Sequence, residues 1–247
     1  MRETRIIMGM PIEIEIVGEG VQESIEDAFA YLTEVDARFS TYKEDSEISR
    51  INRGEIQIEA GSQEMREVFA LAEKTKQETN GYFDIRRPDG SIDPSGIVKG
   101  WAILEAAKSI KAAGYTDFFV NAGGDIASSG KNARSEEWSF GIRNPFDTAL
   151  IVKVIYPKGA GIATSGSYIR GAHIYNPHAP EEGLLEVVSI TIIGPDVLEA
   201  DRFATAAFAM GKEGIAFIEK LPGFEGYAID KKGTATFTSG FAAYTNP

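Results

Sequence analysis

The sequence predicts an α+β fold, in which strands and helices come in separate groups along the chain rather than in strict alternation. Three observations lead to this class. Apolar residues recur at helical spacing in the first half, short apolar runs between Gly, Pro and Asn follow in the middle, and helical spacing returns near the end. No repeat, low-complexity stretch or proline-rich linker divides the chain. We therefore expect a single domain over residues 1–247 with no visible internal boundary.

The first half of the chain predicts one strand and three helices, at 12–17, 21–39, 62–80 and 98–113. The strand alternates Ile with Glu, as a half-buried strand does. Ser62 is a plausible N-cap of the second helix, which has acidic residues early and lysines late. The third helix should stop at Gly114 and turn Trp101, Leu104 and Ala107 inward.

The second half predicts strands at 118–121, 138–142, 151–156, 161–164, 187–193, 226–229 and 234–237. Two further helices are expected between the last of the central strands and the terminal ones, at 197–210 and 213–220. This order of grouped elements is typical of antiparallel or mixed sheets with flanking helices.

Composition excludes several classes of function. The 247 residues include no cysteine, which rules out disulfides and thiolate chemistry, and the net charge of -12 argues against a nucleic-acid partner. We expect no transmembrane segment, because no apolar stretch approaches the ~20 residues that one needs. If Met1 is the native start, the protein is expected in the cytoplasm; a trimmed export signal would make it periplasmic or exported.

Two glycine-containing segments are candidates for ligand binding. Asn121-Ala-Gly-Gly-Asp125 follows an apolar strand and is either a tight turn or a close approach of the backbone to a ligand. The segment from Asp93 to Gly100 leads into a helix and brings a carboxylate, a glycine and Lys99 together. It is either an ordinary capping turn or a loop that presents amides and an ammonium group to a polyphosphate.

Candidate catalytic residues lie further along the chain. His173 stands in a polar, glycine-rich stretch near Arg170, and it is either a structural histidine or a general base that suits neutral pH. Asp201 and Thr205 are four residues apart and so project from one helix face. They are either two oxygen ligands for Mg²⁺ or an exposed carboxylate beside a threonine that bonds back to the helix.

The order of these segments resembles the ApbE family, the FAD:protein FMN transferases. The likeness runs from about residue 8 to residue 210. The blocks that carry it are Met8-Gly9, Ser40-Thr41-Tyr42, residues 46–52, Gly81-Tyr82-Phe83-Asp84, Asp93…Lys99-Gly100, Asn121-Ala-Gly-Gly-Asp125, Thr164-Ser-Gly166, His173…Asn176-Pro177 and Ala200-Asp201…Ala204-Thr205. The resemblance implies a T-fold-like domain of two interlocked lobes with an FAD site between them.

The resemblance also implies which residues form that site. By their place in the motifs, the residues that would contact FAD are Met8, Tyr42, Tyr82, Phe83, Asp84, Asp93, Lys99 and Tyr175. Mg²⁺, or Mn²⁺ in its place, would be held by the Gly96 carbonyl, Asp201 and Thr205, and His173 and Asp201 would be catalytic. Three features depart from the family pattern: Met10 replaces a threonine, the stretch between Asp84 and Asp93 is short, and Asn176 replaces an acid.

The implied reaction is Mg²⁺-dependent transfer of the FMN moiety of FAD onto a threonine or serine hydroxyl of an acceptor flavoprotein, with release of AMP. Family acceptors carry an Asp-Gly-x-[Ser/Thr]-x-Ala-Thr segment, which this chain lacks, so transfer is expected onto a separate protein. Two alternatives remain open, a metal-dependent FAD pyrophosphatase that yields FMN and AMP and a non-catalytic FAD-binding module. A pure carrier has no need of the Asp201 and Thr205 pair.

Overall fold

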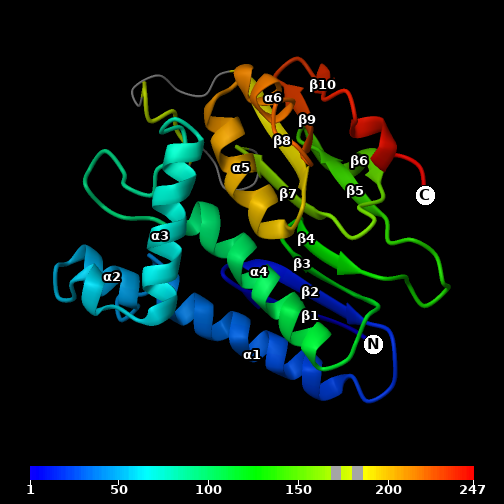
Figure 1. The fold of residues 1–247 in the computed structure, drawn as a ribbon, viewed down its shortest axis with the longest axis horizontal. Coiled ribbons are helices and arrows are strands. Elements are labelled where there is room, and N and C mark those ends of the chain that lie inside the picture. Colours follow the sequence, from blue (N-terminus) through cyan, green and yellow to red (C-terminus); the bar gives the residue numbers. More distant parts are fainter. Residues whose placement is uncertain (168–173, 180–185) are drawn as a thin grey trace.

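The main β-sheet of the computed structural model has eight strands, each antiparallel to its neighbours in the part of the chain that the structure describes, residues 1–167, 174–179 and 186–247. In spatial order the strands are β1 (Arg2–Ile7), β2 (Met10–Ile16), β3 (Phe118–Ala122), β4 (Asp125–Ser129), β7 (Gly161–Gly166), β8 (Val187–Gly194), β9 (Glu225–Asp230) and β10 (Ala235–Phe237). Two more strands, β5 (Phe140–Asn144) and β6 (Asp147–Ile155), form a separate hairpin (Figure 1).

The eight-stranded sheet consists of two halves that meet at β4 and β7. Between these strands the ladder holds one residue pair, Ile126 opposite Ile162. By contrast, β7 and β8 pair over six positions. Within the first half, β2 pairs with β3 although they are far apart in sequence, with Ile12 opposite Ala122. We call the contact of β4 with β7 the seam of the sheet.

Helices cover each half separately and meet across the seam. α1 (Gln22–Phe39) and α4 (Ser95–Ala112) pack on the half with β1–β4, whereas α5 (Val197–Ala209) and α6 (Glu213–Ile218) pack on the half with β7–β10 (Figure 1). α4 and α5 pack directly against each other. α2 (Glu47–Asn52) contacts α1, and α3 (Gln63–Glu78) contacts α4. Short 3₁₀ turns lie at Ile58–Ala60 and Phe241–Tyr244.

The apolar spacing of the sequence explains the core. α1 buries the face formed by Ile25, Phe29, Leu32, Val35 and Phe39, whose intervals of three and four residues place them on one side of a helix. One large apolar cluster fills the first half, and two smaller clusters lie on α5 and α6 and on the opposite side of β7–β9. Each half therefore has its own core, and the site between them depends on how α4 meets α5.

The predicted fold class is confirmed, and each predicted strand and helix overlaps an observed one. Ser62 caps α3 as predicted, since its hydroxyl accepts a hydrogen bond of 3.2 Å from the Met65 amide. α4 begins at Ser95, three residues before the predicted start, and β1, α2 and β4 were not predicted. The division into two interlocked lobes stays a prediction. None of the described helices is both long and apolar enough to cross a membrane.

Candidate active site

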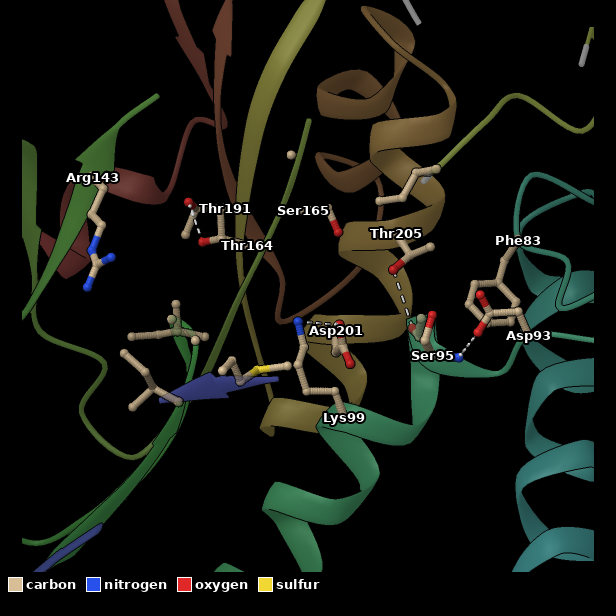
Figure 2. Close-up of a pocket in the computed structure, with 18 of the residues that line it drawn as sticks. Phe83, Asp93, Ser95, Lys99, Arg143, Thr164, Ser165, Thr191, Asp201 and Thr205 are labelled. Carbon is tan, nitrogen blue, oxygen red and sulfur yellow. Dashed lines mark hydrogen bonds and ion pairs between the residues drawn. The ribbon is translucent and has the colours of Figure 1, made fainter. Parts of the chain in front are cut away.

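A cavity lies at the seam and is walled by both halves of the sheet. It is a cleft open to solvent, with about 1420 Å³ of empty space when the solvent at its mouth is included. Its lining comes from the segment before α4, from α4 itself, β4, the β5–β6 hairpin, β7, β8 and α5 (Figure 2). Three of the predicted metal ligands and six of the predicted FAD contacts line it: Gly96, Asp201, Thr205, Tyr82, Phe83, Asp84, Asp93, Lys99 and Tyr175.

The predicted metal ligands meet where α4 contacts α5. The Thr205 hydroxyl donates to the Gly96 carbonyl oxygen at 3.3 Å, rather than back to its own helix, which was the alternative to a metal-ligand role. Two oxygens of an octahedral Mg²⁺ shell with bonds of ~2.1 Å lie about 3 Å apart when they are neighbours. The observed oxygen separation therefore fits two ligands of one cation. Asp201, one helical turn before Thr205, would add a carboxylate oxygen.

Gly100 makes the close contact of α4 with Asp201 possible. Its amide, which in a regular helix points at the Gly96 carbonyl, donates to Oδ2 of Asp201 at 2.7 Å. A Cβ atom at position 100 would lie 2.7 Å from Cβ of Asp201 and 2.9 Å from the Val197 carbonyl oxygen. Only glycine allows this approach, which fixes the position of Asp201 and leaves the Gly96 carbonyl accessible to Thr205 or a cation.

Two buried carboxylates share the ammonium group of Lys99. Asp125 and Asp201 are 1% and 2% exposed. Lys99 Nζ lies 2.6 Å from Oδ2 of Asp125 and 3.8 Å from Oδ1 of Asp201. Burial raises the pKa of Asp201; Lys99 acts in the opposite direction, and Asp125 adds to the rise. When both carboxylates are ionised, Lys99 balances one of their two negative charges, so the site suits a further cation.

The small number of acidic side chains at the site also indicates which metal ion it suits. Among the described residues, no group of three or more His, Cys, Asp or Glu side chains is placed to hold a metal ion. One carboxylate, one hydroxyl and one carbonyl are hard oxygen donors, and Mg²⁺ commonly binds such a sparse set while it keeps waters or substrate phosphates. The donor chemistry therefore fits Mg²⁺.

The wall next to the metal ligands is formed by the segment before α4 and by residues near Tyr175. Asp93 accepts a hydrogen bond from the Ser95 amide at 3.0 Å and forms an ion pair with Arg87. Its carboxylate thus organises the entry into α4. The Tyr175 hydroxyl donates to the Arg86 carbonyl oxygen at 2.9 Å, and burial raises the pKa of this phenol. Tyr175 therefore acts here as a neutral donor.

Two predicted FAD contacts, Met8 and Tyr42, do not line the cavity. Met8 lies in the turn between β1 and β2 with a positive φ of 55°, and Met10 lines the cavity instead, two positions along the chain. Tyr42 is 95% exposed and is absent from the cavity lining. The assignment of Met8 and Tyr42 as FAD contacts therefore stays a prediction. His173 lies outside the described residues.

Several lining residues were not predicted as site residues. Figure 2 shows Arg143, from β5, on the side of the pocket opposite Thr205 and Asp201, with Thr164 and Thr191 between them. The hydroxyls of Thr164 and Thr191 lie 2.9 Å apart. Asp125 was recognisable as the acid that ends Asn121-Ala-Gly-Gly-Asp125, and Oδ1 of Asp125 accepts from the Thr164 amide at 3.0 Å. For Arg143 the sequence offers no local signal.

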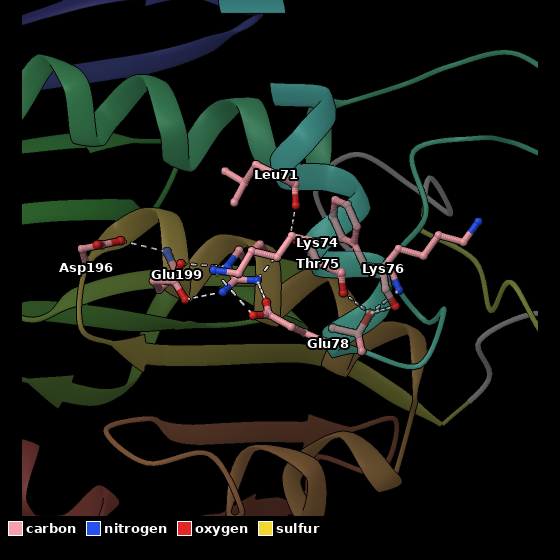
Figure 3. Close-up of polar contacts among 10 residues, drawn as sticks. Leu71, Lys74, Thr75, Lys76, Glu78, Asp196 and Glu199 are labelled. Atoms are coloured by element: carbon pink, nitrogen blue, oxygen red, sulfur yellow. Dashed lines mark hydrogen bonds and ion pairs between the residues drawn. The ribbon is translucent and has the colours of Figure 1, made fainter. Parts of the chain in front are cut away.

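A buried guanidinium anchors α5 next to the site. Arg202, the neighbour of Asp201, contacts Glu199 through two hydrogen bonds of 2.9 and 2.6 Å and also pairs with Glu78. Nη1 of Arg202, the nitrogen that pairs with Glu78, also donates to the Thr75 hydroxyl at 3.2 Å. Figure 3 shows Glu78 and Thr75 of α3 facing Glu199 of α5 across this contact. Arg202 therefore ties α5 to α3 and holds the helix that carries Asp201.

Comparison with known sequences identifies relatives. The model of the ApbE family matches residues 8–87 and 85–228. A relative called FAD:protein FMN transferase, from Klebsiella pneumoniae, is 30% identical over 169 residues, which cover 65% of this chain and 47% of the relative. Another of the same name, from Haemophilus influenzae, is 24% identical over 86% of this chain and 83% of its own length. The chain thus matches about half the length of several curated relatives, the first of them included.

Comparison with solved structures shows the same architecture. Flavin Transferase ApbE from Vibrio cholerae matches with a TM-score of 0.85 at 23% identity, covering 99% of this chain and 98% of that one. The ApbE protein from Thermotoga maritima matches with a TM-score of 0.86 at 20% identity, covering 100% and 99%. At these identities the likeness establishes the fold, an α+β domain of antiparallel sheets with flanking helices.

Proposed function

The chain belongs to the ApbE family, and from that premise we propose that it is an FAD:protein FMN transferase. It moves the FMN moiety of FAD onto a threonine or serine hydroxyl of a separate acceptor flavoprotein and releases AMP. The observation that carries the proposal is the group of hard oxygens from Gly96, Asp201 and Thr205 at the wall of the cavity between the two halves of the sheet. A site that merely binds FAD has no use for such a group.

Different residues of the cavity have different proposed roles in the reaction. Mg²⁺, or Mn²⁺, held by Gly96, Asp201 and Thr205 would neutralise charge on the pyrophosphate and on the departing AMP. Lys99 adds a positive charge at the same place, and Asp125 holds its ammonium group in position at 2.6 Å. Tyr82, Phe83, Asp84, Asp93 and Tyr175 are proposed to bind FAD, since they line the cavity beyond the metal ligands.

The transfer step is a displacement at phosphorus. The acceptor hydroxyl oxygen attacks the FMN-side phosphorus, a phosphoester bond forms, and the anhydride bond to AMP breaks. The hydroxyl proton passes to a base, and we propose His173 for this role because its ordinary pKa suits neutral pH. Positioning and charge neutralisation supply most of the rate enhancement in reactions of this class.

Mass spectrometry of an acceptor domain that carries the Asp-Gly-x-[Ser/Thr]-x-Ala-Thr segment tests the proposal directly. With FAD and Mg²⁺ the acceptor should gain the mass of one FMN moiety, and EDTA should prevent the gain. Asp201→Asn and Thr205→Val should nearly abolish transfer. Thr191→Val is the matched control, because Thr191 lines the same cavity but lies outside the metal ligands, and it should retain most activity.

Other outcomes would exclude the transferase. Release of free FMN and AMP with an unmodified acceptor would identify a pyrophosphatase, and unchanged FAD would leave only a binding role. His173→Ala should slow transfer by about 10²–10⁴-fold, the usual loss for a general base. Transfer at the unaltered rate by this variant would refute the role of His173 and leave the metal site untouched.

A further inference from the structure

The β5–β6 hairpin exposes an unusual amount of apolar surface. Phe146 is 57% exposed, Leu150 54% and Val154 45%. With Ile151 and Val152 they account for five of the nine large hydrophobic side chains that are exposed among the described residues. We call these five side chains the hairpin surface. Four of them lie within five residues of β6, and exposed apolar residues grouped in this way mark binding sites more often than scattered ones do.

The hairpin surface continues directly from the candidate active site. The same two strands contribute five residues to the cavity lining: Phe140, Gly141, Ile142, Arg143 and Ile155. Ile155 is buried in the cavity wall, while Val154, the preceding residue, is exposed. A molecule bound along β6 would therefore reach the cavity without leaving the protein surface.

The backbone of β6 offers a free edge. Within the described residues, β6 pairs only with β5, which leaves its other edge without a strand partner. Native proteins usually protect such edges, and an open one binds extended peptides by adding them as a further strand. β6 has nine residues, and its pairing with β5 shifts register between Ile142 and Arg143 and again between Arg143 and Asn144. The regular part of the edge is residues 153–155, at the end of β6 that reaches the cavity, and main-chain hydrogen bonds to an added strand are expected there.

The local charge is also distinct from the rest of the chain. The hairpin with its connecting turn carries Arg143 and Lys153 against Asp147, a net charge of +1, while the whole chain carries -12. An acidic peptide thus meets less repulsion here than on the average surface.

We propose that the hairpin is the docking surface for the acceptor protein, which lays an extended segment with apolar side chains along the free edge of β6 and directs its hydroxyl residue into the cavity. This proposal rests on the proposed function, because it supplies the protein partner that FMN transfer requires. Main-chain pairing aligns the segment, and the hairpin surface binds its apolar side chains.

Two peptide acceptors separate docking from chemistry. The long peptide carries the threonine motif and an apolar flank that covers the nine residues of β6; the short peptide retains only the motif. For the unaltered chain, KM for the long peptide should be lower than for the short one. Leu150→Glu with Val152→Glu should raise KM for the long peptide about tenfold, as expected from the loss of two partly buried apolar contacts.

The same variant should leave KM for the short peptide, kcat and FAD affinity unchanged. Ile6→Glu is the matched control, because Ile6 is an apolar residue that is 73% exposed and lies on β1, an edge strand of the main sheet that does not belong to the hairpin. It should change neither KM. Leu150→Ser with Val152→Ser serves as a milder pair should the glutamates prevent folding, and it should raise KM for the long peptide in the same direction.

Three results would overturn the proposal. An equal KM for both peptides, or a KM for the long peptide that the hairpin variants do not change, would refute docking while FMN transfer itself stands. Sedimentation that shows a dimer dissociated by the hairpin variants would assign the surface to a second copy of the chain. Absence of transfer to any acceptor by the unaltered chain would refute the proposed function, and docking with it.

Discussion

Replacing Gly100 by alanine isolates the contact that brings α4 against Asp201. In an unconstrained helix this change is favourable by about 1 kcal/mol, because alanine is the better helix former. Here the added methyl carbon would lie 2.7 Å from Cβ of Asp201 and 2.9 Å from the Val197 carbonyl oxygen. Cβ contacts under 3.0 Å essentially do not occur and ordinary contact begins at 3.4 Å, so the helices must separate by about 0.3–0.7 Å, the differences of these two limits from 2.7 Å.

This separation has a cost in stability and a larger one in metal binding. Overpacking of a tight contact typically costs 1–3 kcal/mol, which cancels or exceeds the gain in helix propensity and leaves a net loss of about 1 kcal/mol. For a chain of 247 residues such a loss lowers Tm by about 2–4 °C. Metal–ligand distances tolerate only about 0.2 Å, so Mg²⁺ affinity should fall by at least tenfold.

Two measurements check this reasoning together. Urea unfolding in EDTA gives the stability of the metal-free chain, and titration of Mg²⁺ against FAD binding gives the metal dependence. Ser109→Ala, at an exposed position of the same helix, is the control: it should raise stability by about 0.5 kcal/mol at most, through helix propensity, and leave Mg²⁺ binding unchanged. A Gly100→Ala variant that is stabilised by the full helix propensity and binds Mg²⁺ normally would refute the reasoning, since the two helices would then have room for the methyl group.

Two further predictions concern stability. Arg202→Met should lower the free energy of unfolding, measured in urea, by about 2–3 kcal/mol. The loss is smaller than for a fully buried pair because Glu78 and Glu199 are partly exposed. Lys74→Met is the control: Lys74 and Glu78 form an exposed ion pair of 3.7 Å, and its loss should change the free energy of unfolding by under about 0.5 kcal/mol. Equal effects of the two substitutions would contradict this. The pKa of Asp230 is lowered mainly by a hydrogen bond from the Thr234 amide, so its carboxylate stabilises the fold above the unfolded pKa of about 3.9, and that contribution disappears as pH falls through the folded pKa. Asp230→Ala should therefore lower Tm at pH 7 and by less at pH 3, and a difference that is constant with pH would contradict the assignment.

The elements that the sequence predicts well are those whose pattern repeats. The buried face of α1 recurs over five turns, and α3 adds an N-cap at Ser62, so both are predictable from local physics. β1 is an edge strand with Ile6 exposed, and its side chains show little apolar alternation. α2 has six residues, too few for a helical period to appear. These elements form because the finished sheet and α1 give them a surface to pack on.

The candidate site shows the same division between local and long-range information. Spacing alone places Asp201 and Thr205 on one helix face, which the structure confirms, while their role as metal ligands stays a prediction. The full burial of Asp201 depends on Gly100, which is distant in sequence and has no local signature of this contact. Arg143 reaches the cavity only because the hairpin folds back beside the seam. The roles of Gly100 and Arg143 can therefore be identified from the tertiary structure and not from the local sequence.

The pairing of β2 with β3 has a consequence for synthesis of the chain. β2 cannot pair with β3 until Ala122, the partner of Ile12, has been synthesised. A ribosome that adds ~5–20 residues per second needs about 5–20 s to make the intervening chain. During that interval the emerging β2 has β1 on one side and an unsatisfied edge on the other, which is the kind of surface that nucleates aggregation. The β7–β10 region pairs strands closer together in sequence and can form soon after its last residue emerges. The N-terminal half is thus where a nascent chain has the greatest need of a chaperone.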